Sequence, residues 1–179
     1  QTPKENGRLT LNPLVHLDLF GSLLLLVAGF GWAKPVPVNP YVLNRHSPSA
    51  FMWVSLAGPL SNLLMAIAAS IPIRLGLIQY QISTSSFIPT AYEFMIEFII
   101  INLALMLFNL IPLAPLDGEK VLDFFLPQNL RQGWKKIKQY GPIILLALVF
   151  VLPMVGIDLI SMVLYPALSG LLRILIGGF

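Results

Sequence analysis

The stretch FNLIPLAPLDGE, residues 108–119, ends a long apolar run with two prolines and an acidic residue. Pro112 and Pro115 lack a backbone N–H, and the residue before a proline disfavours the helical conformation, so a helix entering this stretch must unwind. Asp117 and Gly118 follow directly. Within a membrane, unwound backbone is tolerated only where protein or water surrounds it. The stretch therefore predicts that Asp117 faces a wet cavity or a protein partner rather than lipid.

The composition of the chain places this stretch in a membrane protein. Of 179 residues, 56% are hydrophobic and 11% are charged, and the mean hydropathy is +0.81, outside the range of soluble globular domains. Cysteine is absent, which excludes disulfides, thiolate metal ligands and a cysteine nucleophile. We expect an all-α polytopic protein that crosses the lipid bilayer with about four to five membrane segments.

Apolar segments lie on both sides of the motif. The predicted segments are Leu19–Ala33, which is short for a crossing, Phe51–Ile73, Tyr92–Leu116, and a C-terminal hairpin of Pro142–Leu152 and Ile157–Ile176. A short extended or β region is expected near the N-terminus, from the alternating RLTL at 8–11 and the proline-rich KPVPVNP at 34–40. We therefore divide the chain into a membrane core at 1–123, a basic segment at 124–141 and the hairpin at 142–179.

The charges of the loops predict the orientation. The loop 119–140 carries five basic residues, Lys120, Arg131, Lys135, Lys136 and Lys138, against two acids, Glu119 and Asp123. The positive-inside rule places this loop in the cytoplasm, and residues 75–90 outside. Residues 128–139 are an interfacial helix or a solvated loop. Topology explains the net charge of +3, so no nucleic-acid partner is expected.

Two interpretations of Asp117 follow from residue chemistry. A carboxylate with a glycine beside it can approach a metal closely, at about 2.0–2.2 Å for zinc, and an ionisable group near a membrane cavity is by default a functional candidate. Alternatively, Asp117 caps a cytoplasmic helix that begins at Gly118.

Four motifs resemble one known family. NLIPLAPLDG at 109–118 is similar to the Asn/Pro/Asp-Gly signature of the site-two protease family of intramembrane zinc metalloproteases. GPLSN at 58–62, GRLTLNPLVHLD at 7–18 and GWAKPVPV at 31–38 follow the order seen in bacterial members. The resemblance covers about residues 7–123.

The resemblance implies a function and site residues. It implies an integral protein of the bacterial plasma membrane that binds one zinc ion and cleaves membrane-protein substrates. Asp117 would be the third metal ligand, and Asn62 would contact the substrate backbone or the oxyanion. From residue chemistry alone, Asn62 and Ser61 are equally candidates for hydrogen bonds between helices. Asn102 and Asn109 lie on one helix face and either line the same cavity or pack helices.

One departure from the family concerns its first two zinc ligands and its general base, which lie on a His-Glu-x-x-His helix. The sequence has no such motif, and its only histidines are His16 and His46. The family places that helix shortly upstream of the GRLTLNP stretch, so we expect it to precede Gln1. The alternative is a catalytically inactive, protease-like subunit that scaffolds a membrane complex. The role of His16 stays open among a zinc ligand, a residue supporting the ligands and a loop residue.

Overall fold

The computed structural model describes residues 49–80 and 88–177, and before them residues 7, 10, 12, 15, 17–20, 22, 23 and 47. The chain separates into two compact units, residues 1–50 and 51–179. Both histidines, residues 34–40 and most of the stretches 8–11 and 19–33 lie outside the described residues. No strand occurs in the described part, so the extended N-terminal region stays a prediction. The second unit contains parts of all three expected domains, whose boundaries also stay predictions.

Four helices of the described part are long and apolar enough to cross a membrane. They are Ala50–Arg74, Ala91–Asn109, Gln128–Met154 and Leu159–Ile176. This confirms an all-α architecture with four candidate membrane spans. The charge-free stretch 51–73 was predicted as a span, and helix α3 (Ala50–Arg74) matches it to one residue at either end.

Helix α3 runs through two internal prolines, Pro59 and Pro72. Each proline removes one backbone donor, and side-chain hydroxyls can satisfy carbonyls near such a position. Ser61 Oγ donates to the carbonyl oxygen of Gly58 at 2.7 Å, and Ser55 Oγ donates to that of Phe51 at 3.0 Å. Helix α3 continues past Pro59, and both hydroxyl groups bond to carbonyl groups of α3 itself.

Helix α4 (Ala91–Asn109) begins with a capping box and ends earlier than expected. Thr90 accepts a hydrogen bond from the backbone N–H of Glu93, and the Glu93 carboxylate accepts one from the N–H of Thr90. Glu93 thus serves as part of the helix cap. The predicted span reached Leu116, but the helix stops at Asn109 because Pro112 cannot donate to the carbonyl one turn before it. Residues 110–116 form an irregular connection.

Four α-helices and one π-helix follow the connection 110–116 in the described part of the chain. They are α5 (Asp117–Phe125), α6 (Gln128–Leu146), the π-helix η2 (Ala147–Val151), α7 (Leu152–Met154) and α8 (Leu159–Ile176). Residues 128–139, expected as an interfacial helix or a solvated loop, are helical and form the first part of α6, which continues through Pro142 without a break; their place at the membrane interface stays a prediction. The chain turns at Val155 and Gly156, where Gly156 has a positive φ of 83° and a break was expected.

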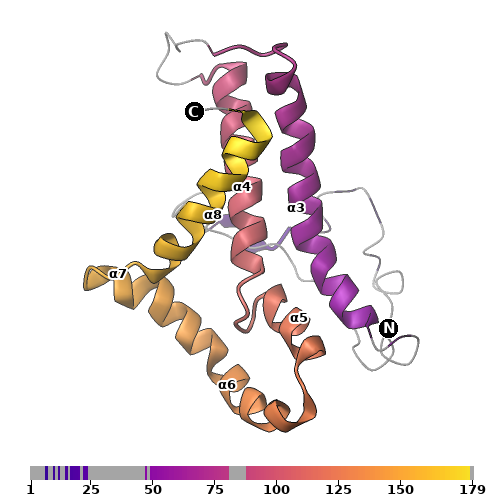
Figure 1. Cartoon of the computed structure of the whole chain (residues 1–179), viewed down its shortest axis with the longest axis vertical. Helices are drawn as coiled ribbons and strands as arrows, with labels where there is room; N and C mark the ends of the chain where they lie inside the picture. Colours follow the sequence, from indigo (N-terminus) through magenta and orange to yellow (C-terminus); the bar gives the residue numbers. More distant parts are fainter. Residues whose placement is uncertain are drawn as a thin grey trace. The chain divides into compact units, whose positions relative to one another are not determined.

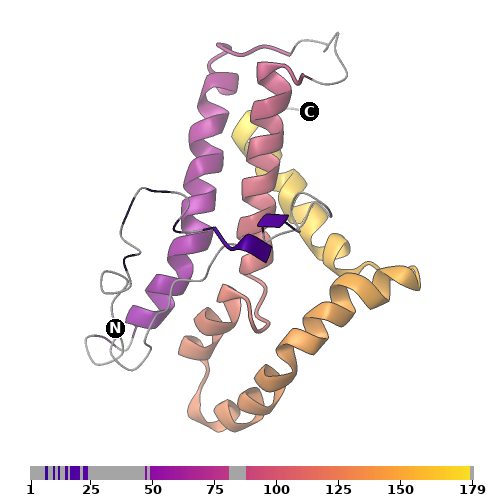
Figure 2. The ribbon, with the colours of Figure 1, turned by 180° about the vertical axis from the view of Figure 1, so that it is seen from behind.

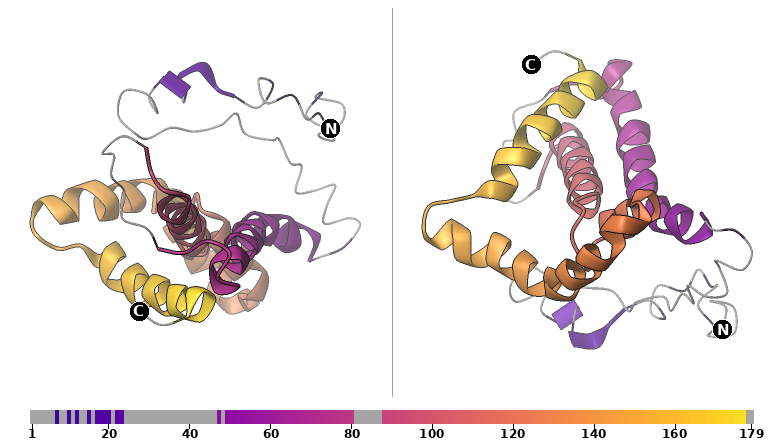
Figure 3. Two further views of the ribbon diagram at one scale, coloured as in Figure 1. Left: turned by 90° about the horizontal axis from the view of Figure 1, so that it is seen from above. Right: turned by 60° about the horizontal axis from the view of Figure 1, so that its bottom comes forward.

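The core of the second unit lies where α4 packs between α3 and α8. Ala66 of α3 and Ile99, Leu103 and Met106 of α4 are buried, and leucines of α8 such as Leu168 pack against them. Figures 1 and 2 show α3 beside α4 from both sides, and Figure 3 shows α4 flanked by α3 and α8.

The C-terminal end of α8 lies near the N-terminal end of α4, away from Asp117. Arg74 at the end of α3 donates from Nη1 to the carbonyl oxygen of Ile174 in α8 at 3.0 Å. Helices α3 and α4 are antiparallel neighbours (Figure 1). Arg74, at the end of α3, therefore lies near the start of α4, whereas Asp117 follows the end of α4.

Candidate functional site

The connection 110–116 presents Asp117 at the start of α5. Leu113 donates its backbone N–H to the carbonyl of Ile111 at 2.8 Å, and Leu116 donates to Leu113 at 2.9 Å. Ala114 and Leu116 are buried, each about 8% exposed. The two tight turns and the two buried side chains hold the connection against the rest of the unit, so the residue that follows it has a defined position.

Two glycines permit the close contacts around this connection. A Cβ atom on Gly118 would lie 2.3 Å from the carbonyl oxygen of Leu110 and 2.5 Å from that of Ile111. A Cβ atom on Gly141 of α6 would lie 2.6 Å from both Cβ and the carbonyl oxygen of Ala114. Real Cβ atoms essentially never approach another atom this closely. Gly118 was expected to let a metal approach Asp117, but its described contact is with the end of α4.

The Asp117 carboxylate is half-buried and has two different neighbours. Its Oδ1 accepts a hydrogen bond from Lys120 Nζ at 2.7 Å, one turn along α5. Its Oδ2 faces α3, where a Cβ atom on Gly58 would lie 3.5 Å away. Asp117 is the first residue of α5 and Leu116 is the N-cap, so the expected cap that would begin a helix at Gly118 is wrong by one residue. Asp117 forms an ion pair rather than a side-chain cap.

The contact at Gly58 joins the two motifs that were far apart in the sequence. Asn62 follows Gly58 by one helical turn and so shares its face of α3. The Asn62 side chain is half-buried and makes no hydrogen bond to any described residue. The neighbouring Ser61 hydroxyl bonds within α3 rather than across to another helix. The expected gluing of two helices by Ser61 and Asn62 is therefore not seen in the described part of the chain.

The two asparagines of α4 are occupied within their own helix. Asn102 Nδ2 donates to the carbonyl of Phe98 at 2.8 Å and is 5% exposed. Asn109 Nδ2 donates to the carbonyl of Leu105 at 2.9 Å. Both amide groups thus satisfy α4 backbone carbonyls.

An ion-pair cluster beside Asp117 was missed by sequence reasoning. Glu119 is 2% exposed, and its Oε1 forms an ion pair with Nζ of Lys138 in α6. Lys138 Nζ also lies 3.9 Å from Oδ2 of Asp123. One turn before Lys138, Trp134 buries an indole Nε1 that has no hydrogen-bond partner among the described residues. The sequence did offer one signal for this cluster: Glu119 is one of only eight acidic residues and lies two residues after the candidate ligand Asp117.

A metal site needs more ligands than the described residues provide. No group of three His, Cys, Asp or Glu side chains that could hold a metal ion occurs in the described part of the chain. Asp117 fits one position of a zinc site, because zinc accepts a carboxylate oxygen as a ligand. Both histidines lie outside the described residues, so the alternatives given for His16 stay predictions.

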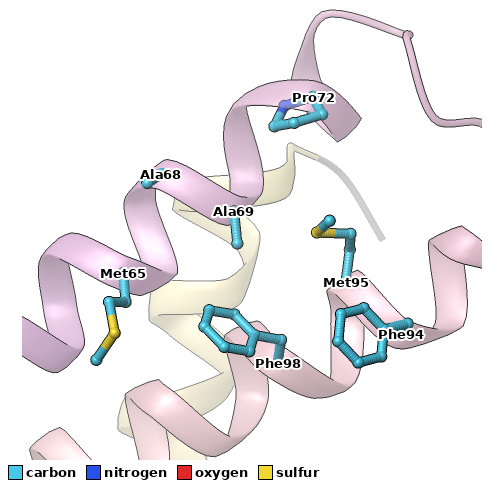
Figure 4. Close-up of a pocket in the computed structure, with 7 residues that line it drawn as sticks. All are labelled: Met65, Ala68, Ala69, Pro72, Phe94, Met95 and Phe98. Atoms are coloured by element: carbon cyan, nitrogen blue, oxygen red, sulfur yellow. The ribbon is translucent and has the colours of Figure 1, made fainter. Parts of the chain in front are cut away.

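A separate apolar pocket lies nearer the other end of α3 and α4. It has a volume of about 340 Å³ and is lined by Met65, Ala68, Ala69, Pro72, Phe94, Met95 and Phe98. Figure 4 shows the side chains of both helices pointing into it. None of these side chains titrates, so the pocket offers no chemistry of its own.

Comparison with known proteins identifies the family. Residues 72–152, which include Asp117, match Peptidase family M50. A Bacillus subtilis (strain 168) protein named "Putative zinc metalloprotease YwhC" is 41% identical over 168 residues, which are 94% of this chain and 74% of that protein. No solved structure matches the chain significantly. The resemblance inferred from the motifs is confirmed, and the chain belongs to peptidase family M50, the site-two protease family.

Proposed function

We propose that the protein is an intramembrane zinc metalloendopeptidase that cleaves membrane-embedded segments of other proteins. Membership of family M50, a relative named as a zinc metalloprotease and four candidate membrane spans support this function. One observation carries it: the Asp117 carboxylate stands where a membrane helix unwinds, with its Oδ2 against Gly58 of the GPLSN motif.

The proposal gives two residues distinct roles. Asp117 supplies one zinc ligand through the oxygen that faces α3. Asn62, on the same face of α3 as Gly58, donates its amide to the substrate backbone or to the oxyanion; its side chain has no competing bond to a described residue. The zinc ion, when bound, polarises the scissile carbonyl and lowers the pKa of a water ligand. The remaining ligands and the general base are proposed to come from a His-Glu-x-x-His helix outside this sequence.

The orientation belongs to the same proposal. Residues 119–140, which form most of α5 and the first part of α6, lie in the cytoplasm of a bacterial cell, because their five basic residues satisfy the positive-inside rule. Asp117, just before this segment, then works near the cytoplasmic face of the plasma membrane. Membrane proteins whose spans enter that region are the proposed substrates. A purely structural, inactive subunit is not favoured, since the matched family is a peptidase family and the relative carries the name "Putative zinc metalloprotease YwhC".

Zinc content tests the central assignment. The intact protein is purified with Asp117→Ala and with Glu97→Ala, which removes an exposed acid of α4 with no ion pair to a described residue. We expect about one zinc ion per chain in the wild type and in Glu97→Ala. Asp117→Ala should lose most of its zinc, because one of the three protein ligands is removed. Zinc retained by Asp117→Ala would remove Asp117 from the site.

A further inference from the structure

The carboxylate of Glu119 is nearly inaccessible to solvent and lies two residues after Asp117. Its side chain is 3% exposed, and a buried charge is costly unless a counter-charge or hydrogen bonds compensate it. Oε1 makes no hydrogen bond, and its counter-charge is the ammonium of Lys138 in an ion pair. The pair joins α5, which begins with Asp117, to α6.

Among the lysines of α6, Lys138 forms the ion pair with Glu119. Lys138 also approaches Asp123, one turn after Glu119, so one ammonium serves two carboxylates on one face of α5. Lys135 and Lys136 are exposed and make no ion pair with any described residue. The exposed positive charges of α6 are explained by topology, whereas Lys138, whose side chain is 40% exposed, pairs with a buried carboxylate.

A second contact of α6 lies on the other side of Asp117. Gly141, three residues after Lys138, packs directly on Ala114, three residues before Asp117. Lys138 meets Glu119, two residues after Asp117. The helix α6 thus contacts the chain immediately before and immediately after the carboxylate, and the segment between these contacts is short.

We propose that Lys138 is a positioning residue for Asp117: through Glu119 it fixes α5 so that Asp117 Oδ2 keeps facing Gly58 of α3. The role rests on the proposed function in so far as Asp117 binds zinc. A ligand carboxylate must be held to within tenths of an ångström, and residues that orient ligands commonly change metal affinity 10–100-fold when removed. The ammonium of Lys138 acts on the metal only through Glu119 and the backbone of α5.

The test uses variants of the intact protein that separate charge from packing. Lys138→Met keeps an unbranched side chain one atom shorter and removes its charge, Lys138→Arg keeps the charge, and Lys136→Met is the matched control on the exposed face of α6. Zinc affinity is measured by competition with a chelator. The visible spectrum of the cobalt-substituted protein reports ligand geometry, and hydrogen exchange of the peptide 110–119 reports local order without metal.

We expect Lys138→Met to weaken zinc binding about tenfold, to change the cobalt spectrum and to speed exchange in 110–119 but not in 91–109. Lys138→Arg should stay within about threefold of wild type. Lys136→Met should change nothing. Wild-type zinc affinity in Lys138→Met, or an equal loss in Lys136→Met, would overturn the role of Lys138.

The metal-free measurement keeps this inference separate from the proposed function. If the wild type binds no zinc, or if Asp117→Ala leaves zinc unchanged, the proposed function fails. The exchange of 110–119 then still decides whether Lys138 orders this segment. Faster exchange in Lys138→Met alone supports the positioning role, and unchanged exchange overturns it.

Discussion

The close contact between Gly141 and Ala114 makes a sharp prediction for Gly141→Ala. The added Cβ would lie 2.6 Å from Cβ and the carbonyl oxygen of Ala114 and 3.0 Å from its Cα. Carbon atoms pack at about 3.5–4.0 Å, so α6 and the connection must separate by roughly 1 Å. Two of the three atoms met belong to the backbone, so no flexible side chain can move aside. The matched control is Gly133→Ala in the same helix, where an added Cβ meets nothing within 4 Å.

The comparison of the two variants isolates the steric cost. Replacing glycine by alanine inside a helix stabilises it by about 0.5–1 kcal/mol, and both variants gain this. Inserting a methyl group into a packed contact costs about 1–3 kcal/mol, and only Gly141→Ala pays it. Gly133→Ala should therefore be slightly more stable than wild type. Gly141→Ala should be about 1–3 kcal/mol less stable than Gly133→Ala.

Thermal unfolding in detergent, followed by circular dichroism, measures the difference. For a chain of this size, 1 kcal/mol corresponds to about 2–4 °C, so the two variants should unfold at least about 2 °C apart. Gly141→Ala should also release zinc more readily, because Ala114 lies three residues before Asp117. Equal unfolding temperatures for the two variants would show that α6 does not pack on the connection as described.

Three further predictions concern other parts of the chain. The pKa of Asp158 is lowered by the hydrogen bond from the Ser161 backbone N–H. The stabilisation of α8 by this carboxylate is therefore present above pH 3.8, its ordinary pKa, and is lost as the pH falls through the lower pKa of the folded state. The difference in unfolding temperature between wild type and Asp158→Asn should shrink in that acidic range and stay constant above about pH 5. The double variant Pro112→Ala, Pro115→Ala regains two backbone donors and should insert and fold but lose substrate cleavage in a membrane assay, and cleavage at the wild-type rate would contradict a positioning role for the prolines. Cysteines placed at Leu77 and at Lys136 should react with an impermeant reagent from opposite sides of the membrane, and labelling from one side would contradict the orientation.

The spans were predictable from sequence where the signal was local. The charge-free stretch 51–73 specifies α3, because length and hydropathy alone decide whether a segment crosses a membrane. The end of α4 was placed too late, since a proline affects the helical turn before it as well as its own position, and the helix stops at Asn109. The segments 124–141 and 142–179 were predicted as separate parts, yet α6 runs through Pro142 and so crosses the boundary between them.

The site was only partly predictable. Asp117 stood out by its chemistry, but its neighbour Gly58 lies 59 residues earlier, and only the family resemblance linked the two motifs. Local periodicity carries no information about which helices pair. The Glu119–Lys138 pair was missed because the lysines of α6 were explained together by topology. Charge counts explain where a loop lies but not which of its charges has a buried partner.

The position of Asp117 is determined largely by close backbone contacts at two glycines. Gly118 brings the start of α5 against the end of α4, and Gly141 brings α6 against the connection, while Gly58 of α3 lies within ordinary contact distance of the carboxylate. In a membrane, helices gain no hydrophobic free energy by leaving lipid, so association depends on close packing at small residues. Backbone contacts also vary less than contacts between long side chains, which change rotamer. A carboxylate whose surroundings are fixed by glycines on α5 and α6 is therefore well suited to hold one geometry, as a metal ligand requires.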